Sequence, residues 1–118
     1  GYEVSAHLLI RRCGEAVQFV SFCERAWHAG QSCFEGRENC NDFSIGIELE
    51  GTDEEPYANR QYEVLGGVTA ALLAAFPSLS EERIVGHCDI APGRKTDPGE
   101  AFDWSRYRAS LNWRGRLV

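Results

Sequence analysis

The chain has 118 residues, of which 43% are hydrophobic and 25% charged, and its formal net charge is -6. This length and composition predict one globular domain with a single apolar core. The negative charge argues against nucleic acid or an anionic membrane surface as a partner. No apolar run is long enough to span a bilayer.

The five cysteines are an odd number and show no C-x-x-C spacing. This pattern argues against a disulfide framework and against a zinc knuckle built from thiolates. Free thiols in a reducing compartment are the expected state. Cys88 lies next to His87, but a small buried thiol is more common than a ligand or a nucleophile.

The first two elements are predicted to form a β-hairpin, because apolar runs at 5–12 and 16–22 flank a short turn with a glycine. His7 lies inside the first run, where we expect a hydrogen-bonded structural histidine. Residues 25–43 are rich in Gly, Ser and Asn without a sustained period, which predicts a long loop, and such loops are usually functional. Its Trp27-His28 pair fits a ligand cleft and a plug against the core equally well.

Residues 44–50 alternate strictly between apolar and other side chains, which predicts a strand. The second face carries Ser44 and Gly46, which are small, followed by Glu48. Small residues leave room for a ligand beside a carboxylate that can act as a base. The alternative is that this face points to water, as polar faces of antiparallel sheets commonly do.

The second half of the chain is predicted to contain two helices. Asn59 caps the first, Pro77 ends it, and Gly66-Gly67 in its middle suggests close packing onto the sheet. The other expected elements are an acidic turn at 51–58, a helical turn at 80–83, a short buried strand at 84–86 and a last helix from 102 to about 111. These elements predict an α/β domain with a mixed central sheet flanked by helices.

Residues 86–99 gather charged side chains in a turn-rich stretch at the end of the expected short strand. Imidazole and carboxylate are both ordinary zinc ligands, so His87 and Asp97 could meet on a divalent metal. Lys95 would put a positive charge beside whatever the metal polarises. The alternative is a loop whose charges are solvated, since this spacing alone is not a strong zinc signature.

Six segments together resemble a known enzyme family over nearly the whole chain and in the right order. They are residues 4–10, 25–30, 40–53, 86–92, 94–99 and 102–104. The family is the zinc amidases that cleave N-acetylmuramoyl-L-alanine bonds, whose fold is shared with peptidoglycan recognition proteins. The resemblance implies Zn²⁺ as cofactor and an anhydro-muramyl peptide as substrate.

The resemblance also implies residue roles. His87 and Asp97 match two of the family's three zinc ligands, Glu48 matches its catalytic glutamate and Lys95 its catalytic lysine. Positions that resemble the lining of the substrate cleft are Trp27, His28 and Arg94.

The family's remaining zinc ligand is a histidine on an earlier strand, in a segment that would precede Gly1. We therefore expect residues 1–118 to be one amidase domain that is incomplete at its N-terminus. The implied function is hydrolysis of the amide bond between (1,6-anhydro-)N-acetylmuramic acid and L-alanine, by a cytoplasmic bacterial monomer that recycles cell-wall muropeptides. The alternative is a muropeptide-binding domain without catalysis, because one ligand is absent.

Overall fold

The structure, a computed structural model, describes residues 6–26 and 28–115. Its main sheet has the strand order β2-β1-β5. β1 (Leu8–Ile10) pairs antiparallel with β2 (Ala16–Gln18) and parallel with β5 (Ile47–Leu49). The predicted hairpin and the mixed sheet are confirmed, with strands shorter than the apolar runs that indicated them.

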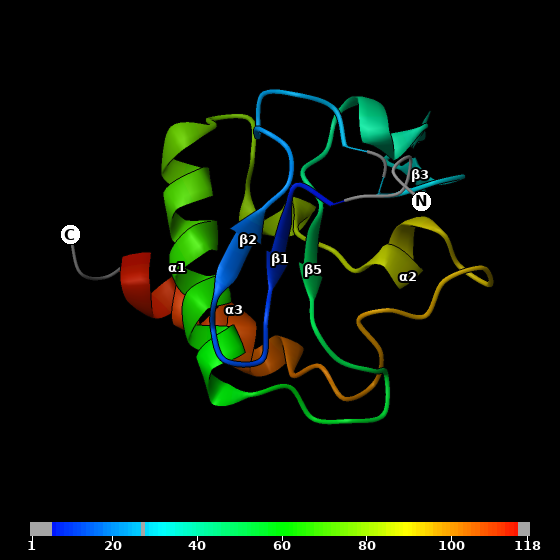
Figure 1. Cartoon of the computed structure of the whole chain (residues 1–118). Helices are drawn as coiled ribbons and strands as arrows, with labels where there is room; N and C mark the ends of the chain where they lie inside the picture. The colour runs from blue at the N-terminus through cyan, green and yellow to red at the C-terminus, as the bar shows by residue number, and fades with distance from the viewer. Residues whose placement is uncertain (1–5, 27, 116–118) are drawn as a thin grey trace.

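Two long helices cover the inner face of this sheet: α1 (Asn59–Ala75) and α3 (Trp104–Gly115). Figure 1 shows α1 and α3 together, while α2 (His87–Ile90) and the loop after it lie beyond β5. No helix in the described part of the chain is long and apolar enough to cross a membrane.

The core lies between the sheet and the two helices. Alternate residues of β1 point into it, and aromatic rings from α1, α3 and their flanking loops fill the rest. The buried members are Leu8, Ile10, Tyr57, Tyr62, Leu65, Phe102, Tyr107 and Leu111. Tyr107 also shares a hydrogen bond of 2.6 Å with the hydroxyl of Thr69, and burial raises the pKa of its phenol.

The start of α1 differs from the prediction that Asn59 caps it. Ala58 occupies the cap position, and its N–H donates to the side chain of Gln61 at 2.8 Å. The amide nitrogen of Gln61 donates to the carbonyls of Ile10 and Glu50, at 3.2 and 2.9 Å. One buried glutamine therefore joins the helix start to the ends of β1 and β5.

The two glycines in α1 differ: Gly66 is buried, whereas Gly67 does not have the close packing that we predicted from the pair. Nothing lies within 4 Å of where a Cβ on Gly67 would be, so this position does not require a glycine for close approach to the sheet. The helix ends as predicted, with Phe76 at the C-cap and Pro77 after it.

The segment 25–43 is a loop for most of its length but contains two short elements. β3 (Cys33–Phe34) and β4 (Arg37–Glu38) form a small hairpin, and a 3-10 turn covers Cys40–Asp42. The backbone at Glu35-Gly36 has positive φ values of 50° and 80°, the turn geometry that suits a two-residue hairpin. Strands of two residues are too short to leave a period in the sequence.

The predicted buried strand at 84–86 is wrong. The structure gives no strand there, because the backbone is bonded elsewhere: Ile84 N–H donates to the Glu81 carbonyl, and Gly86 N–H donates to the Asp89 carboxylate. The expected helical turn before it is confirmed at Glu81–Arg83. The last helix starts at Trp104, two residues later than predicted.

Candidate functional site

His87 and Asp97 lie together at the far end of the molecule from α1. His87 is the first residue of α2, and its Nδ1 lies 3.2 Å from Oδ2 of Asp97. Its other nitrogen, Nε2, donates to the carbonyl oxygen of Ala29 at 2.8 Å. The imidazole is 17% exposed and the carboxylate 56% exposed, so the pair opens to solvent on the aspartate side.

The chemistry of this pair calls for a cation. Because Nε2 carries the proton given to Ala29, a neutral imidazole turns its Nδ1 lone pair toward a carboxylate oxygen of Asp97. Two electron-rich atoms at this distance repel each other, and a proton or a metal ion between them removes the repulsion. Among the described residues, no group of three or more His, Cys, Asp or Glu side chains gathers to hold a metal.

The loop that carries Asp97 is fixed by hydrogen bonds from three directions. The N–H of Cys88 donates to the Asp97 carbonyl at 3.0 Å, and the Tyr57 hydroxyl donates to the Pro98 carbonyl at 2.8 Å. The hydroxyl of Thr96 donates to the carboxylate of Asp53. Burial and the nearby Asp53 raise the pKa of the Tyr57 phenol, which therefore stays a donor.

His28 fills the space that the small residues of β5 were predicted to leave for a ligand. A Cβ on Gly46 would lie 2.3 Å from Cγ of His28, so the glycine is needed for this close approach. The Ser44 hydroxyl donates to the Cys40 carbonyl at 2.6 Å, and His28 Nε2 therefore donates to Ser44 Oγ at 3.1 Å. Burial, together with the charges of His7 and His87, lowers the pKa of His28 to about 4.

Glu48 lies beyond the ring of His28 on the same face of β5 and is exposed. A cavity of about 750 Å³ runs along this edge of the sheet and is lined by His28, Glu48, His87 and Asp97 among others. Glu48 therefore lines the same cavity as the predicted metal pair. The roles of these side chains stay predictions, since their chemistry is not tested by their position.

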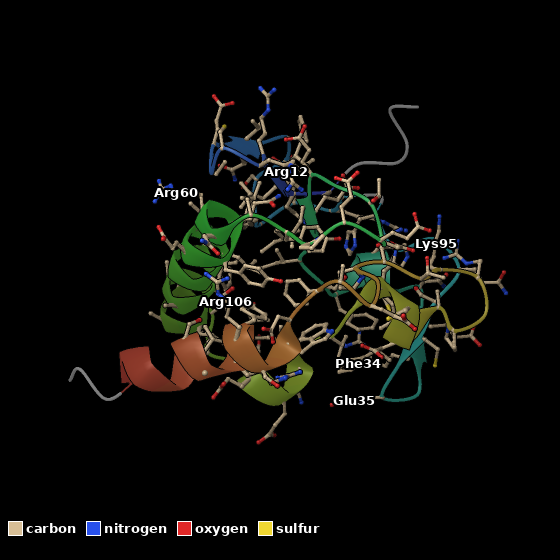
Figure 2. All side chains as sticks on the ribbon, turned by 90° about the horizontal axis from the view of Figure 1, so that it is seen from below. Arg12, Phe34, Glu35, Arg60, Lys95 and Arg106 are labelled. Atoms are coloured by element: carbon tan, nitrogen blue, oxygen red, sulfur yellow. The ribbon has the colours of Figure 1, made fainter. Side chains whose placement is uncertain are left out.

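The two basic residues after α2 have different surroundings. Lys95 is exposed, its side chain makes no contact in the described structure, and Figure 2 shows it on the site side, away from Arg60 and Arg106. Arg94 is bound to the chain itself: Nη2 donates to the carbonyls of Ala29 and Gln31, at 2.6 and 2.8 Å. Neither residue lines the cavity.

The other residues singled out in the sequence are His7, Trp27 and the cysteines. His7 is 1% exposed; Gly46 N–H donates to its Nδ1 and its Nε2 donates to the Glu24 carbonyl, which confirms a structural role. Trp27 lies outside the described residues. All five cysteines are free, and Cys88 is only partly buried rather than a buried filler. Burial raises the pKa of the Cys88 thiol, which argues against a thiolate.

Sequence reasoning missed the residues that support this site. Asn41 is 7% exposed, and its Oδ1 accepts hydrogen bonds from the backbone N–H groups of His28 and Ala29, at 3.0 and 2.9 Å. Asn41 thereby fixes the loop backbone at residues 28 and 29, where the Ala29 carbonyl accepts a hydrogen bond from His87. An asparagine in a polar loop gives no period or spacing that marks such a role.

Curated relatives match this chain closely over part of their length. The chain is 63% identical over 110 residues to 1,6-anhydro-N-acetylmuramyl-L-alanine amidase AmpD of Escherichia coli, a match that covers 93% of this chain and 60% of the relative. N-acetylmuramoyl-L-alanine amidase AmiD of Escherichia coli is 38% identical over 98 residues, covering 75% of this chain and 35% of AmiD. The chain thus spans about 60% of the length of AmpD.

Solved structures share the fold. A crystal structure of a selenomethionine AmpD derivative superposes with a TM-score of 0.89 at 60% identity, over 92% of this chain and 60% of that one. A complex of Escherichia coli AmiD with the substrate anhydro-N-acetylmuramic acid-L-Ala-D-γ-Glu-L-Lys gives a TM-score of 0.86 at 33% identity, over 93% and 49%. The family described as N-acetylmuramoyl-L-alanine amidase matches residues 1–100. This chain is therefore a member of the N-acetylmuramoyl-L-alanine amidase family.

Proposed function

We propose that this domain hydrolyses the amide bond between (1,6-anhydro-)N-acetylmuramic acid and the L-alanine of a muropeptide stem, with a zinc ion held by His87 and Asp97. The observation that carries the proposal is the facing pair of Nδ1 and Oδ2, 3.2 Å apart. The names of the relatives, and the anhydro-muramyl peptides bound in two related structures, support the substrate class. The role would be in cell-wall recycling in the bacterial cytoplasm, where the five free thiols stay reduced.

The two side chains fit zinc. Zinc ligands lie about 2.0–2.2 Å from the ion in a tetrahedral arrangement, which places neighbouring ligand atoms about 3.3–3.6 Å apart. Nδ1 and Oδ2, at 3.2 Å, are close to this spacing, and the bond from Nε2 to Ala29 leaves Nδ1 free to bind. A third ligand is not among the described residues near this pair. We propose that it comes from the part of the relatives' length that this chain does not span.

When bound, zinc would lower the pKa of a water molecule toward about 7 and so supply a nucleophile at neutral pH. Glu48 would take the proton from the water as its oxygen bonds to the carbonyl carbon, and would give a proton to the alanine nitrogen as the C–N bond breaks. Lys95 would stabilise the negative charge on the carbonyl oxygen. The exposure of Glu48 and Lys95 gives a substrate access to both.

The test uses the chain joined to the segment that supplies the third ligand, and measures its zinc content and its cleavage of an anhydro-muramyl peptide. His87→Ala is the variant, and Asp89→Asn is the matched control on α2. Asp89 is exposed and its carboxylate only accepts the Gly86 N–H, which an amide oxygen can also accept. We expect the chain and the control to bind zinc and release the free stem peptide, and His87→Ala to do neither. Cleavage that persists in His87→Ala or in the presence of a chelator contradicts the proposal.

A second candidate function is muropeptide binding without cleavage. It is favoured by one observation, that only two metal-ligating side chains meet in the described residues. The same experiment separates the two functions: a muropeptide that binds tightly to a zinc-free chain and stays intact supports the binding domain. The presence of Glu48 in the same cavity as the pair favours the amidase, since binding alone does not need a base there.

A further inference from the structure

We infer that Arg94 is a positioning residue that holds the Ala29 carbonyl against His87, and so fixes which nitrogen of His87 is free to bind the metal. This inference rests on the proposed function for its metal, but the hydrogen-bond arrangement exists without one. It differs from the expectation, implied by the resemblance, that Arg94 lines the substrate cleft.

The Ala29 carbonyl oxygen accepts two hydrogen bonds from the site. Nη2 of Arg94 donates at 2.6 Å and Nε2 of His87 donates at 2.8 Å, so the guanidinium and the imidazole share one acceptor. An imidazole that donates from Nε2 presents Nδ1 to Asp97. Carbonyls that accept from a metal-binding histidine set its tautomer and ring orientation.

The guanidinium also determines where this carbonyl lies. Nε and Nη2 of Arg94 donate to the Gln31 carbonyl at 3.2 and 2.8 Å, so that one side chain spans two carbonyls of the 29–31 turn. Gly30, between them, has φ +63°, and a Cβ there would lie 2.8 Å from Nη2. The turn is therefore shaped to receive the guanidinium, and a planar fork with several donors suits this task better than an ammonium.

The opposite side of the same turn is held independently. Asn41 binds the N–H of Ala29, and the Ser32 hydroxyl donates to the Gly30 carbonyl at 3.1 Å. These bonds keep the turn folded, while Arg94 alone ties it to the loop that follows α2. Loss of Arg94 should thus let the Ala29 carbonyl move relative to His87 without unfolding the turn.

Two readings of Arg94 predict opposite changes in metal affinity. If the guanidinium acted only through its charge, its removal would take a like charge away from the metal and would strengthen zinc binding. If it positions Ala29, its removal frees the imidazole to change tautomer and weakens zinc binding by about 10–100-fold, the usual effect of losing a partner of a metal ligand. A role in binding substrate alone would leave zinc affinity unchanged and raise KM.

The experiment follows the ring nitrogens of ¹⁵N-labelled histidine by NMR and zinc affinity by competition with a chelator, in the chain and in Arg94→Ala. In the metal-free chain at pH 8.5 we expect the His87 proton on Nε2, and in Arg94→Ala a mixture of both tautomers with 10–100-fold weaker zinc binding. Arg94→Lys keeps the charge and should restore zinc affinity only in part. An unchanged tautomer in Arg94→Ala, or zinc affinity that does not fall, overturns the inference.

Lys95→Ala is the matched control, because it removes the same charge from the next position and touches neither Ala29 nor Gln31. We expect it to leave the His87 tautomer unchanged and not to weaken zinc binding. If the unaltered chain, joined to the segment that supplies the third ligand, binds no zinc, the proposed metal fails, while the tautomer in the metal-free protein still decides the role of Arg94. If Arg94→Ala does not fold, Arg94→Lys carries both measurements.

Discussion

The two halves of this molecule are held together by different forces. On the helical side, Phe102 packs against the rings of Tyr57, Tyr62, Trp104 and Tyr107, with ring centroids 4.9–5.8 Å apart. On the site side, side chains of the loops bind backbone groups of other loops, and few of them are apolar. The first half is stabilised by buried apolar area, the second by individual polar atoms in fixed places.

This difference separates stability from function. Each residue of the aromatic core packs against many others. One substitution there therefore changes the free energy of unfolding without moving the distant site. In the loops, each carbonyl or amide has one or two partners, so one substitution can misplace a functional atom while most of the fold is kept. The predictions below test this contrast.

The largest effect is expected at Glu48. Glu48→Gln keeps the size of the side chain but removes the base, so we expect cleavage of an anhydro-muramyl peptide to fall by about 10²–10⁴-fold. Unfolding in urea and zinc content should not change, because Glu48 is exposed and has no bonded partner in the described structure. Glu50→Gln, two residues along the same face, is the control, since its amide oxygen can still accept from the Arg12 N–H. Equal loss in both variants would contradict a special role for Glu48.

Phe102→Ala, unlike Glu48→Gln, should change the stability of the fold. Phe102 is 6% exposed at the centre of the aromatic cluster, and its truncation is expected to lower the free energy of unfolding by about 3–5 kcal/mol. Phe19→Ala removes the same ring from a position that is 55% exposed and should change stability by less than about 0.5 kcal/mol. Urea unfolding followed by circular dichroism measures both. Similar losses would show that Phe102 is not the centre of the core.

Apolar periodicity predicted the helical half because burial by area leaves a pattern in the sequence. The spacing of apolar residues predicted a helix between Asn59 and Pro77, where the structure has α1, and the alternation at 44–50 predicted the strand that contains β5. The N-terminal cap of α1 was less predictable than its apolar face. Asn59 has the right chemistry for a cap, but Gln61 binds two strand ends as well as Ala58, and such tertiary bonds outweigh a local preference.

The sequence predicted the side chains of the site better than their surroundings. Because imidazole and carboxylate are common metal ligands, His87 and Asp97 were predicted to meet, and the structure places Nδ1 and Oδ2 3.2 Å apart. The Ala29 carbonyl that orients His87 has no signature, because every residue has a carbonyl. The resemblance put Arg94 in the lining of the substrate cleft, but it could not show that Arg94 donates to two backbone oxygens.

The short segment 84–86 shows a further limit. Its apolar residues predicted a strand, yet the Ile84 carbonyl accepts from Arg108 on α3 and the Gly86 N–H is taken by Asp89. A strand needs a neighbour with free backbone groups, and no described strand pairs with this segment. Apolar content alone does not contain that information.

A moderate loss of stability is expected when the loop side loses one buried acceptor. Asn41→Ala leaves the N–H groups of His28 and Ala29 without their partner, which should cost about 1–3 kcal/mol of unfolding free energy. Asn59→Ala is the control, because Asn59 is exposed and accepts only from the Arg106 guanidinium. Because Asn41 also fixes the Ala29 carbonyl, zinc affinity should fall in Asn41→Ala and stay unchanged in the control. A loss of stability without any loss of zinc affinity would show that Asn41 does not position the metal site.

The smallest effect is a pH dependence that comes from His28. Its pKa is lowered from 6.5 to about 4 in the folded chain, mainly by burial. Between these two values the unfolded chain binds a proton that the folded chain does not, so the free energy of unfolding decreases as pH falls from 7.5 to 5.0. His28→Gln removes the titrating group and keeps a donor for Ser44, so it should lose less stability over the same interval. Urea unfolding of the metal-free proteins at both pH values measures the difference, in which the carboxylates, His7 and His87 cancel because both proteins contain them. An equal loss in the two proteins would contradict a pKa of His28 that burial lowers in the folded chain.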